Sequence, residues 1–182
     1  MEKYCLYGED AVLMVIDIQE KLIPAMKYGE QVIRNTNILI SLAQKLEVPV
    51  LVTEQYPKGL GKTAPDLSGN LCEASTFEKT TFSGCIPEVI STLQGLERKK
   101  IIVTGTETHV CVLQTVRDLL AQDYHVFVVG DAVCSRTKNN YRNGLSLMAS
   151  MGAVVTNTET VFFDLIKQSG TPLFKELSKL IK

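Results

Sequence analysis

Short apolar runs alternate with amphipathic segments along this chain of 182 residues, and that alternation limits the possible folds most strongly. The first run, Ala11–Ile16, is apolar at every position and is followed by Asp17. Such runs are typical of strands buried on both faces, as in parallel sheets. Similar runs recur at 48–53, 101–104, 126–129 and 153–155. The sequence therefore predicts several buried, parallel strands.

Between these runs, apolar residues recur at helical spacing. Each of four segments keeps its apolar residues on one face, which is the pattern of a helix packed against a core. These residues are Val32, Leu39, Ala43 and Leu46; Ile86, Val89, Ile90 and Leu93; Val112, Val116, Leu119 and Leu120; and Tyr141, Leu145 and Met148. The alternation of strands and helices predicts an α/β fold, a parallel sheet with helices on both faces.

The composition narrows the class of protein. Hydrophobic residues make up 45% and charged residues 21% of the chain, which suits one globular domain spanning residues 1–182. The net charge is −1, so no basic surplus points to a nucleic-acid partner. No signal-peptide pattern and no membrane-length apolar run occurs. We expect no membrane partner and a cytoplasmic location, with an organelle left open.

The five cysteines are widely spaced, and no C-x-x-C pair occurs among them. This spacing argues against both a disulfide framework and a thiolate zinc site. Reduced thiols are expected, and Cys111 stands out because it follows a predicted strand at the start of an amphipathic helix. The positive end of a helix lowers the pKa of a thiol. Cys111 is therefore a candidate nucleophile, and a buried structural cysteine is the alternative.

Two further charged residues occupy notable positions. Asp17 ends the first predicted strand, where it can act as a general base or as a helix N-cap. Lys79 alternates with apolar neighbours and points either inward or to solvent. In open parallel sheets, ligands bind at the carboxyl ends of the strands. That rule places Asp17, the turn 105–111 and Gly130-Asp131 at one edge.

Three separated blocks resemble the isochorismatase-like cysteine hydrolases. Val15-Ile-Asp-Ile-Gln19 is similar to the family's strand ending in an aspartate, and Lys79-Thr-Thr-Phe-Ser83 resembles its K-x-x-x-S block. Gly105-Thr-Glu-Thr-His-Val-Cys-Val112 resembles its G-x-x-T-x-x-C-V turn. Within the family, 53–63 looks closest to the YcaC-related and isochorismatase-domain-containing proteins. The resemblance implies a three-layer αβα, Rossmann-like fold with a six-stranded, mainly parallel sheet.

The resemblance also implies a mechanism. Cys111 would attack a small amide or related carbonyl substrate, Asp17 would take the thiol proton, and Lys79 would stabilise the thiolate. A thioester would form and water would hydrolyse it. Backbone N–H groups of Glu107 and Cys111 would form the oxyanion hole, beside a cis peptide at Thr106-Glu107. We expect substrate contacts from Gln19, Tyr56, Phe82 and His109.

Other features of the resemblance concern metals and assembly. Related nicotinamidases hold a metal through histidines after the second strand, whereas 54–75 contains no histidine. No metal and no cofactor are therefore expected. The family commonly forms homo-oligomers, and we expect one here. The alternative function is a catalytically silent family member that serves as a binding or assembly module.

Overall fold

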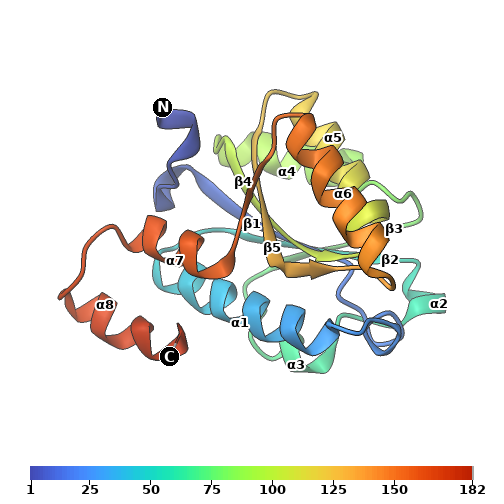
Figure 1. Ribbon diagram of the computed structural model, residues 1–182, viewed down its shortest axis with the longest axis horizontal. Coiled ribbons are helices and arrows are strands. Elements are labelled where there is room, and N and C mark those ends of the chain that lie inside the picture. The colour runs from blue at the N-terminus through green and yellow to red at the C-terminus, as the bar shows by residue number, and fades with distance from the viewer. Residues whose placement is uncertain (182) are drawn as a thin grey trace.

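The computed structural model describes residues 1–181 and contains one six-stranded sheet between two layers of helices (Figure 1). Neighbouring strands all pair in parallel, in the order β3-β2-β1-β4-β5-β6. The predicted three-layer α/β architecture is confirmed, and the sheet is parallel throughout. The strands are β1 (Ala11–Ile16), β2 (Val50–Gln55), β3 (Ser75–Lys79), β4 (Lys100–Thr106), β5 (His125–Cys134) and β6 (Val154–Thr156).

Helices cover both faces of the sheet (Figure 1). One face carries α1 (Gly29–Lys45), α7 (Thr158–Ile166) and α8 (Pro172–Leu177), and the other carries α4 (Pro87–Leu96), α5 (Leu113–Leu120) and α6 (Lys138–Ser150). Two single-turn helices, α2 (Pro57–Leu60) and α3 (Pro65–Ser68), lie in the long loop after β2. A π-helical turn, η4 (Thr108–Val112), leads into α5. The remaining helical turns are 3-10 turns at Glu2–Tyr4, Gly8–Asp10, Ile23–Ala25 and Ser178–Ile181.

The continuous apolar run of β1 is explained by its central place in the sheet. Leu13 and Val15 pack in the core shared with α1, whereas Val12 and Met14 pack in the core shared with α5. Successive side chains of a strand point to opposite faces, so both sets must be apolar when both faces are covered. None of the helices within residues 1–181 is long and apolar enough to cross a membrane.

Strand β5 differs from its sequence prediction. The apolar pattern predicts a strand over 126–129, whereas β5 runs from His125 to Cys134. Its pairing with β4 shifts register between Val103 and Gly105, and Gly105 adopts φ of +136°. A Cβ at Gly105 would overlap the carbonyl of Ile16. This bulge lets β4 and β5 continue pairing beyond Gly130, a residue that the sequence analysis places after the end of the strand.

Candidate active site

The carboxyl edge of the sheet brings a buried carboxylate and a buried ammonium together. Asp17 follows β1 and Lys79 ends β3, and both side chains are 0% exposed. The Nζ of Lys79 lies 2.6 Å from Oδ2 of Asp17. The two residues are 62 positions apart and come from strands separated by β2. Asp17 lies at the edge predicted from the strand ends, and Lys79, which that rule does not include, joins it from the end of β3.

Hydrogen bonds fix Asp17 on two sides. The hydroxyl of Thr53 donates to its Oδ1 at 2.7 Å, and the hydroxyl of Thr106 donates to its carbonyl at 2.6 Å. Its backbone is left-handed, with φ of +51°. The carboxylate therefore has a single defined direction. Neither threonine is predicted from the sequence, although Thr53 lies in β2 and Thr106 ends β4, the two strands that flank β1.

Lys79 is held by four oxygen atoms. Besides Asp17, its ammonium donates to Oε1 of Gln55 at 2.7 Å and to the carbonyls of Phe82 and Thr81 at 3.1 and 3.2 Å. The amide of Gln55 in turn donates to the carbonyl of Thr80 at 2.9 Å. A buried charge is tolerated when it is paired and hydrogen-bonded in this way. Gln55 is a site residue that sequence reasoning misses.

Cys111 lies in η4 and is 6% exposed. The charges of Asp17 and Lys79 both act on its thiol. Burial raises the pKa of the Cys111 thiol to about 12; the Asp17 charge adds to this and Lys79 opposes it. The sequence-based expectation of a lowered pKa is therefore wrong. The dehydrated surroundings and the adjacent carboxylate outweigh the helix terminus.

The pKa of the Asp17 carboxyl is raised as well. Burial raises the pKa of the Asp17 carboxyl, although the charge of Lys79 and hydrogen bonds from Lys79 and Thr53 oppose the change. A carboxylate with a raised pKa is a stronger base than an exposed one. The resting arrangement is accordingly a protonated thiol beside a base, which differs from a preformed thiolate.

The turn between β4 and Cys111 contains the cis peptide Thr106-Glu107, as the family resemblance implies. The carbonyl of Glu107 accepts from the N–H groups of Val110 and Val112 at 2.9 and 3.3 Å. Its carboxylate pairs with Nε of Arg136 at 3.1 Å. The side chain of Glu107 thus points to Arg136, so any role in an oxyanion hole belongs to its backbone. The oxyanion hole of Glu107 and Cys111 stays a prediction.

The four predicted substrate contacts occupy different surroundings. Gln19 is fully buried: its Oε1 accepts from Gln55 N at 2.8 Å, and its Nε2 donates to the carbonyls of Gln55 and Gly61 at 3.0 and 2.7 Å. Gln19 therefore holds the loop after β2. Tyr56 and Phe82 are exposed residues, each at 54%. His109 hydrogen-bonds to Ser135, with Nδ1 at 3.0 Å from its hydroxyl.

A pocket of about 320 Å³ adjoins the end of β3 at Lys79, and neither Asp17 nor Cys111 lines it. It is lined by Tyr56, Pro57, Lys58, Glu78, Lys79 and Thr80. The backbone N–H of Tyr56 donates to the Lys79 carbonyl at 2.8 Å. The backbone of Tyr56 therefore lies next to Lys79, and its ring is exposed. Within residues 1–181, no group of three or more histidine, cysteine, aspartate or glutamate side chains is arranged to hold a metal ion.

Comparison with known proteins assigns relatives over most of the chain. The isochorismatase domain model matches residues 11–160. A Phytophthora sojae protein described as a secreted isochorismatase effector is 42% identical, over 97% of this chain and 87% of its own length. A Xenopus laevis isochorismatase domain-containing protein 2 is 37% identical, over 94% and 83%.

Solved structures give the same picture. A structure described as MAR1 ribonuclease from Caenorhabditis elegans superposes with a TM-score of 0.93 at 41% identity, covering 97% of this chain and 92% of that one. The octameric hydrolase YcaC from Escherichia coli superposes with a TM-score of 0.91 at 21% identity, covering 98% and 89%. At that identity, the likeness to YcaC supports the fold alone.

Proposed function

Because this chain belongs to the isochorismatase family, we propose that it is a cysteine hydrolase that cleaves a small amide or related carbonyl compound. The observation that carries the proposal is the fully buried contact of 2.6 Å between Asp17 and Lys79, beside the thiol of Cys111. A buried ion pair is costly to maintain, and perturbed groups of this kind concentrate at functional sites.

The first step forms a bond between Cys111 Sγ and the substrate carbonyl carbon. The thiol proton passes to the carboxylate of Asp17 as the carbonyl oxygen becomes negative. Because the thiol pKa is about 12, attack needs this base. The raised pKa of Asp17 reduces the difference between the pKa values of the carboxyl and the thiol, which favours proton transfer. Backbone N–H groups of Glu107 and Cys111 are proposed to bind the oxyanion, a contribution of about 10²–10³ in rate in other enzymes.

The second half of the reaction returns the enzyme to its starting state. The tetrahedral adduct collapses to a thioester, and the C–N bond breaks as Asp17 gives its proton to the leaving amine. Water then attacks the thioester, Asp17 accepts a proton from it, and the thiol is re-formed with release of the carboxylic acid. Lys79 holds the carboxylate of Asp17 in place through their contact at 2.6 Å.

A screen of small amides tests this function. The native chain, Cys111→Ala and Cys85→Ala are compared for amine release and, by mass spectrometry, for a trapped acyl adduct. Cys85 is the matched control because burial also raises its pKa to about 12. We expect turnover and an adduct on Cys111 in the native chain and in Cys85→Ala, and neither in Cys111→Ala. Turnover that survives Cys111→Ala contradicts the mechanism.

A second candidate function is RNA cleavage. It is favoured by the 41% identity to the Caenorhabditis elegans protein described as a ribonuclease. The net charge of −1 weighs against it, because RNA-binding surfaces are usually basic. Incubation of single-stranded and duplex RNA with the native chain and with Cys111→Ala separates the two functions. Cleavage that requires Cys111, without amide turnover, would replace the amidase proposal.

Assembly and location are also proposed. YcaC, which shares this fold, is described as octameric, and we propose that this chain forms a homo-oligomer. Light scattering of the purified chain tests that assignment, and a monomeric mass at all concentrations contradicts it. A cytoplasmic location remains our proposal, although one relative is described as secreted. Fractionation of cells that express the native chain tests it.

A further inference from the structure

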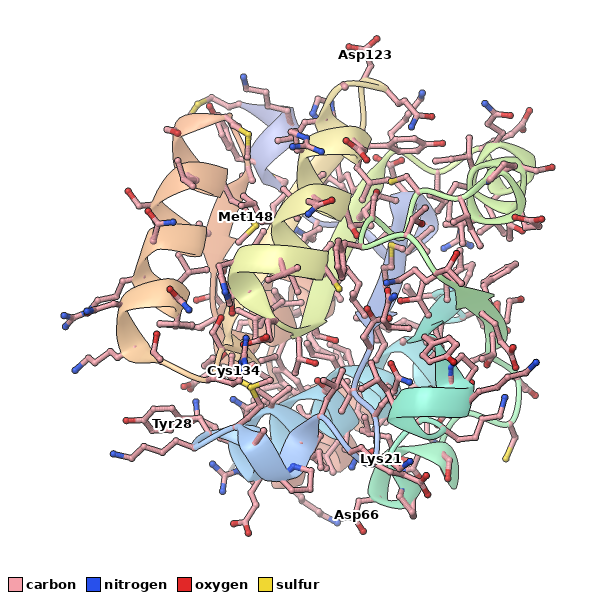
Figure 2. The ribbon with its side chains drawn as sticks, turned by 90° about the vertical axis from the view of Figure 1, so that its right-hand side faces the viewer. Lys21, Tyr28, Asp66, Asp123, Cys134 and Met148 are labelled. Atoms are coloured by element: carbon pink, nitrogen blue, oxygen red, sulfur yellow. The ribbon has the colours of Figure 1, made fainter. Side chains whose placement is uncertain are left out.

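A second pocket, of about 340 Å³, opens where two helices begin. It lies between the end of β5 and the first residues of α1 and α6. In Figure 2, Tyr28 and Cys134, which both line it, lie near each other below α6. None of the lining residues belongs to the Asp17, Lys79 and Cys111 group. They are Lys27, Tyr28, Gln31, Gly130, Val133, Cys134, Ser135, Arg136, Lys138 and Tyr141.

The lining of this pocket is positively charged. Three of its residues, Lys27, Arg136 and Lys138, are cationic and exposed, and none is acidic. One of these cations, Arg136, is paired, because its Nε lies 3.1 Å from the carboxylate of Glu107. Among residues 1–181, Lys27 and Lys138 form no salt bridge, and the Nζ of Lys27 lies 5.5 Å from the centroid of the Tyr28 ring. Two positive charges therefore remain for a ligand.

Two helix N-termini add to this charge. Helix α1 has 17 residues and α6 has 13, and the first turn of each contributes a lining residue, Gln31 and Lys138. The first turn of α6 contains no acidic residue. Glu30, the acidic residue in the first turn of α1, lines a different pocket. Unpaired N–H groups and the helix dipole favour an anion at such ends.

The remaining walls are apolar or aromatic. Val133 and Cys134 are buried, and Tyr28 contributes an exposed ring. The hydroxyl of Tyr141 donates to the carbonyl of Gly130 at 2.9 Å, which holds its ring in place. The hydroxyl of Ser135 is engaged by His109. The pocket thus combines a cationic rim with a rigid apolar wall.

We propose that this pocket binds a small organic anion, a carboxylate or phosphate group carried on an aromatic or aliphatic body. The anion lies between Lys27 and Lys138 at the two helix ends, and the apolar body lies against Tyr28, Val133 and Tyr141. The lining contains no residue of the proposed triad, and it contacts the candidate site through Arg136 with Glu107 and Ser135 with His109.

Calorimetric titration tests this assignment, using the full-length chain that carries Cys111→Ala so that binding at the proposed catalytic thiol does not end in turnover. Benzoate and phenyl phosphate are the probes. Benzamide is the control without a charge, and inorganic phosphate is the control without an aromatic ring. We expect saturable binding of at least one probe, weakened by salt because the contact is electrostatic. The stronger of the two probes identifies the anionic group. Benzamide should bind at least about tenfold more weakly.

Two double variants locate the binding. Lys27→Met with Lys138→Met should weaken the probe at least about tenfold. Lys175→Met with Lys179→Met removes the same charge elsewhere on the surface and should leave affinity unchanged. The assignment is overturned by an absence of saturable binding, by equal binding of benzamide, or by equal affinities of the two double variants. Tighter binding of a short single-stranded RNA through Lys27 and Lys138 would assign the pocket to nucleic acid instead.

Discussion

The ammonium of Lys79 contacts the carboxylate of Asp17 at 2.6 Å, and neither side chain has any exposed surface. Because both side chains are shielded from solvent, each charge depends on the other. Breaking a buried ion pair usually costs about 3–5 kcal/mol, whereas replacing both partners often costs much less. The pair is therefore a sensitive point for both stability and activity.

Single substitutions in this pair should destabilise the fold more than their combination. We expect Asp17→Asn and Lys79→Met each to lower the free energy of unfolding by about 3–5 kcal/mol, because each leaves one charge buried alone. The double variant should lose less than the sum of the two. Urea denaturation of all three variants measures this. Additive losses would show that the two side chains do not stabilise each other.

Reaction of Cys111 with acrylamide should depend on Asp17. With a thiol pKa of about 12, little thiolate exists at neutral pH, so the base must remove the proton during attack. Asp17→Asn should slow labelling of Cys111 by about 10²-fold or more. Labelling of the exposed Cys72 supplies the internal control and should not change. Equal rates at Cys111 in both proteins would exclude Asp17 as the base.

Alkaline stability should fall as the buried thiols titrate. The pKa of Cys111, Cys85 and Cys134 is raised from 9.0 to about 12, so the folded chain keeps protons that the unfolded chain releases. Stability is therefore complete below pH 9.0 and declines as pH rises toward 12. Each thiol contributes at most about 1.4 kcal/mol per pH unit.

Cys85→Ala separates this effect from general alkaline unfolding. The variant should show a shallower decline of unfolding free energy between pH 9.0 and 10.5 than the native chain, measured by urea denaturation. Cys72→Ala, at an exposed position, should leave the slope unchanged. Parallel slopes for all three proteins would show that the buried thiols do not govern the decline.

Removal of the Gln55 amide should lower both stability and kcat, because this amide is a hydrogen-bond partner of Lys79. Gln55→Leu deletes the acceptor at 2.7 Å from the ammonium and leaves it three oxygen partners, and losing a hydrogen bond to a charged group costs roughly 1.5–3 kcal/mol. We expect lower kcat, with Gln55→Glu restoring an acceptor and part of the stability. Gln44→Leu, which removes an exposed bond to Asn70, is the matched control and should be near neutral. Native stability in Gln55→Leu would contradict this role.

Gly105 should be intolerant of a side chain. Its φ of +136° and the overlap of an added Cβ with Ile16 predict that Gly105→Ala destabilises by more than about 2 kcal/mol. Gly95 is the contrasting case, because it lies in α4 with open space around it. Gly95→Ala should stabilise by about 0.5–1 kcal/mol through helix propensity. Thermal unfolding of both variants checks the difference.

The sequence predicts some parts of this molecule well because their cause is local. The run Ala11–Ile16 coincides with β1, since a strand covered on both faces must be apolar throughout. Gln55 and Thr53 are not predicted as site residues. Their contacts depend on the register that pairs Gln55 with Lys79 and Ile16 with Thr53, and register is a property of the assembled sheet.

The thiol of Cys111 shows the other limit of sequence reasoning. Its position before a helix predicts a lowered pKa, and the opposite shift arises from how completely its neighbours enclose it. Burial is the sum of contacts with residues distant in the chain, so no local pattern contains it. The order of Asp17, Lys79 and Cys111 is readable from the sequence, whereas their charge states are not.

Because β3 is an edge strand of the sheet, its register decides whether Lys79 reaches Asp17. This strand pairs with a neighbour on one side only, and Lys79 is its one buried residue. A slip of two residues would preserve which side chains face each way yet move Lys79 by about 7 Å. A chain with that shifted register would retain nearly all its apolar packing and lose the ion pair between Lys79 and Asp17. Such molecules would pass as native by circular dichroism while being inert.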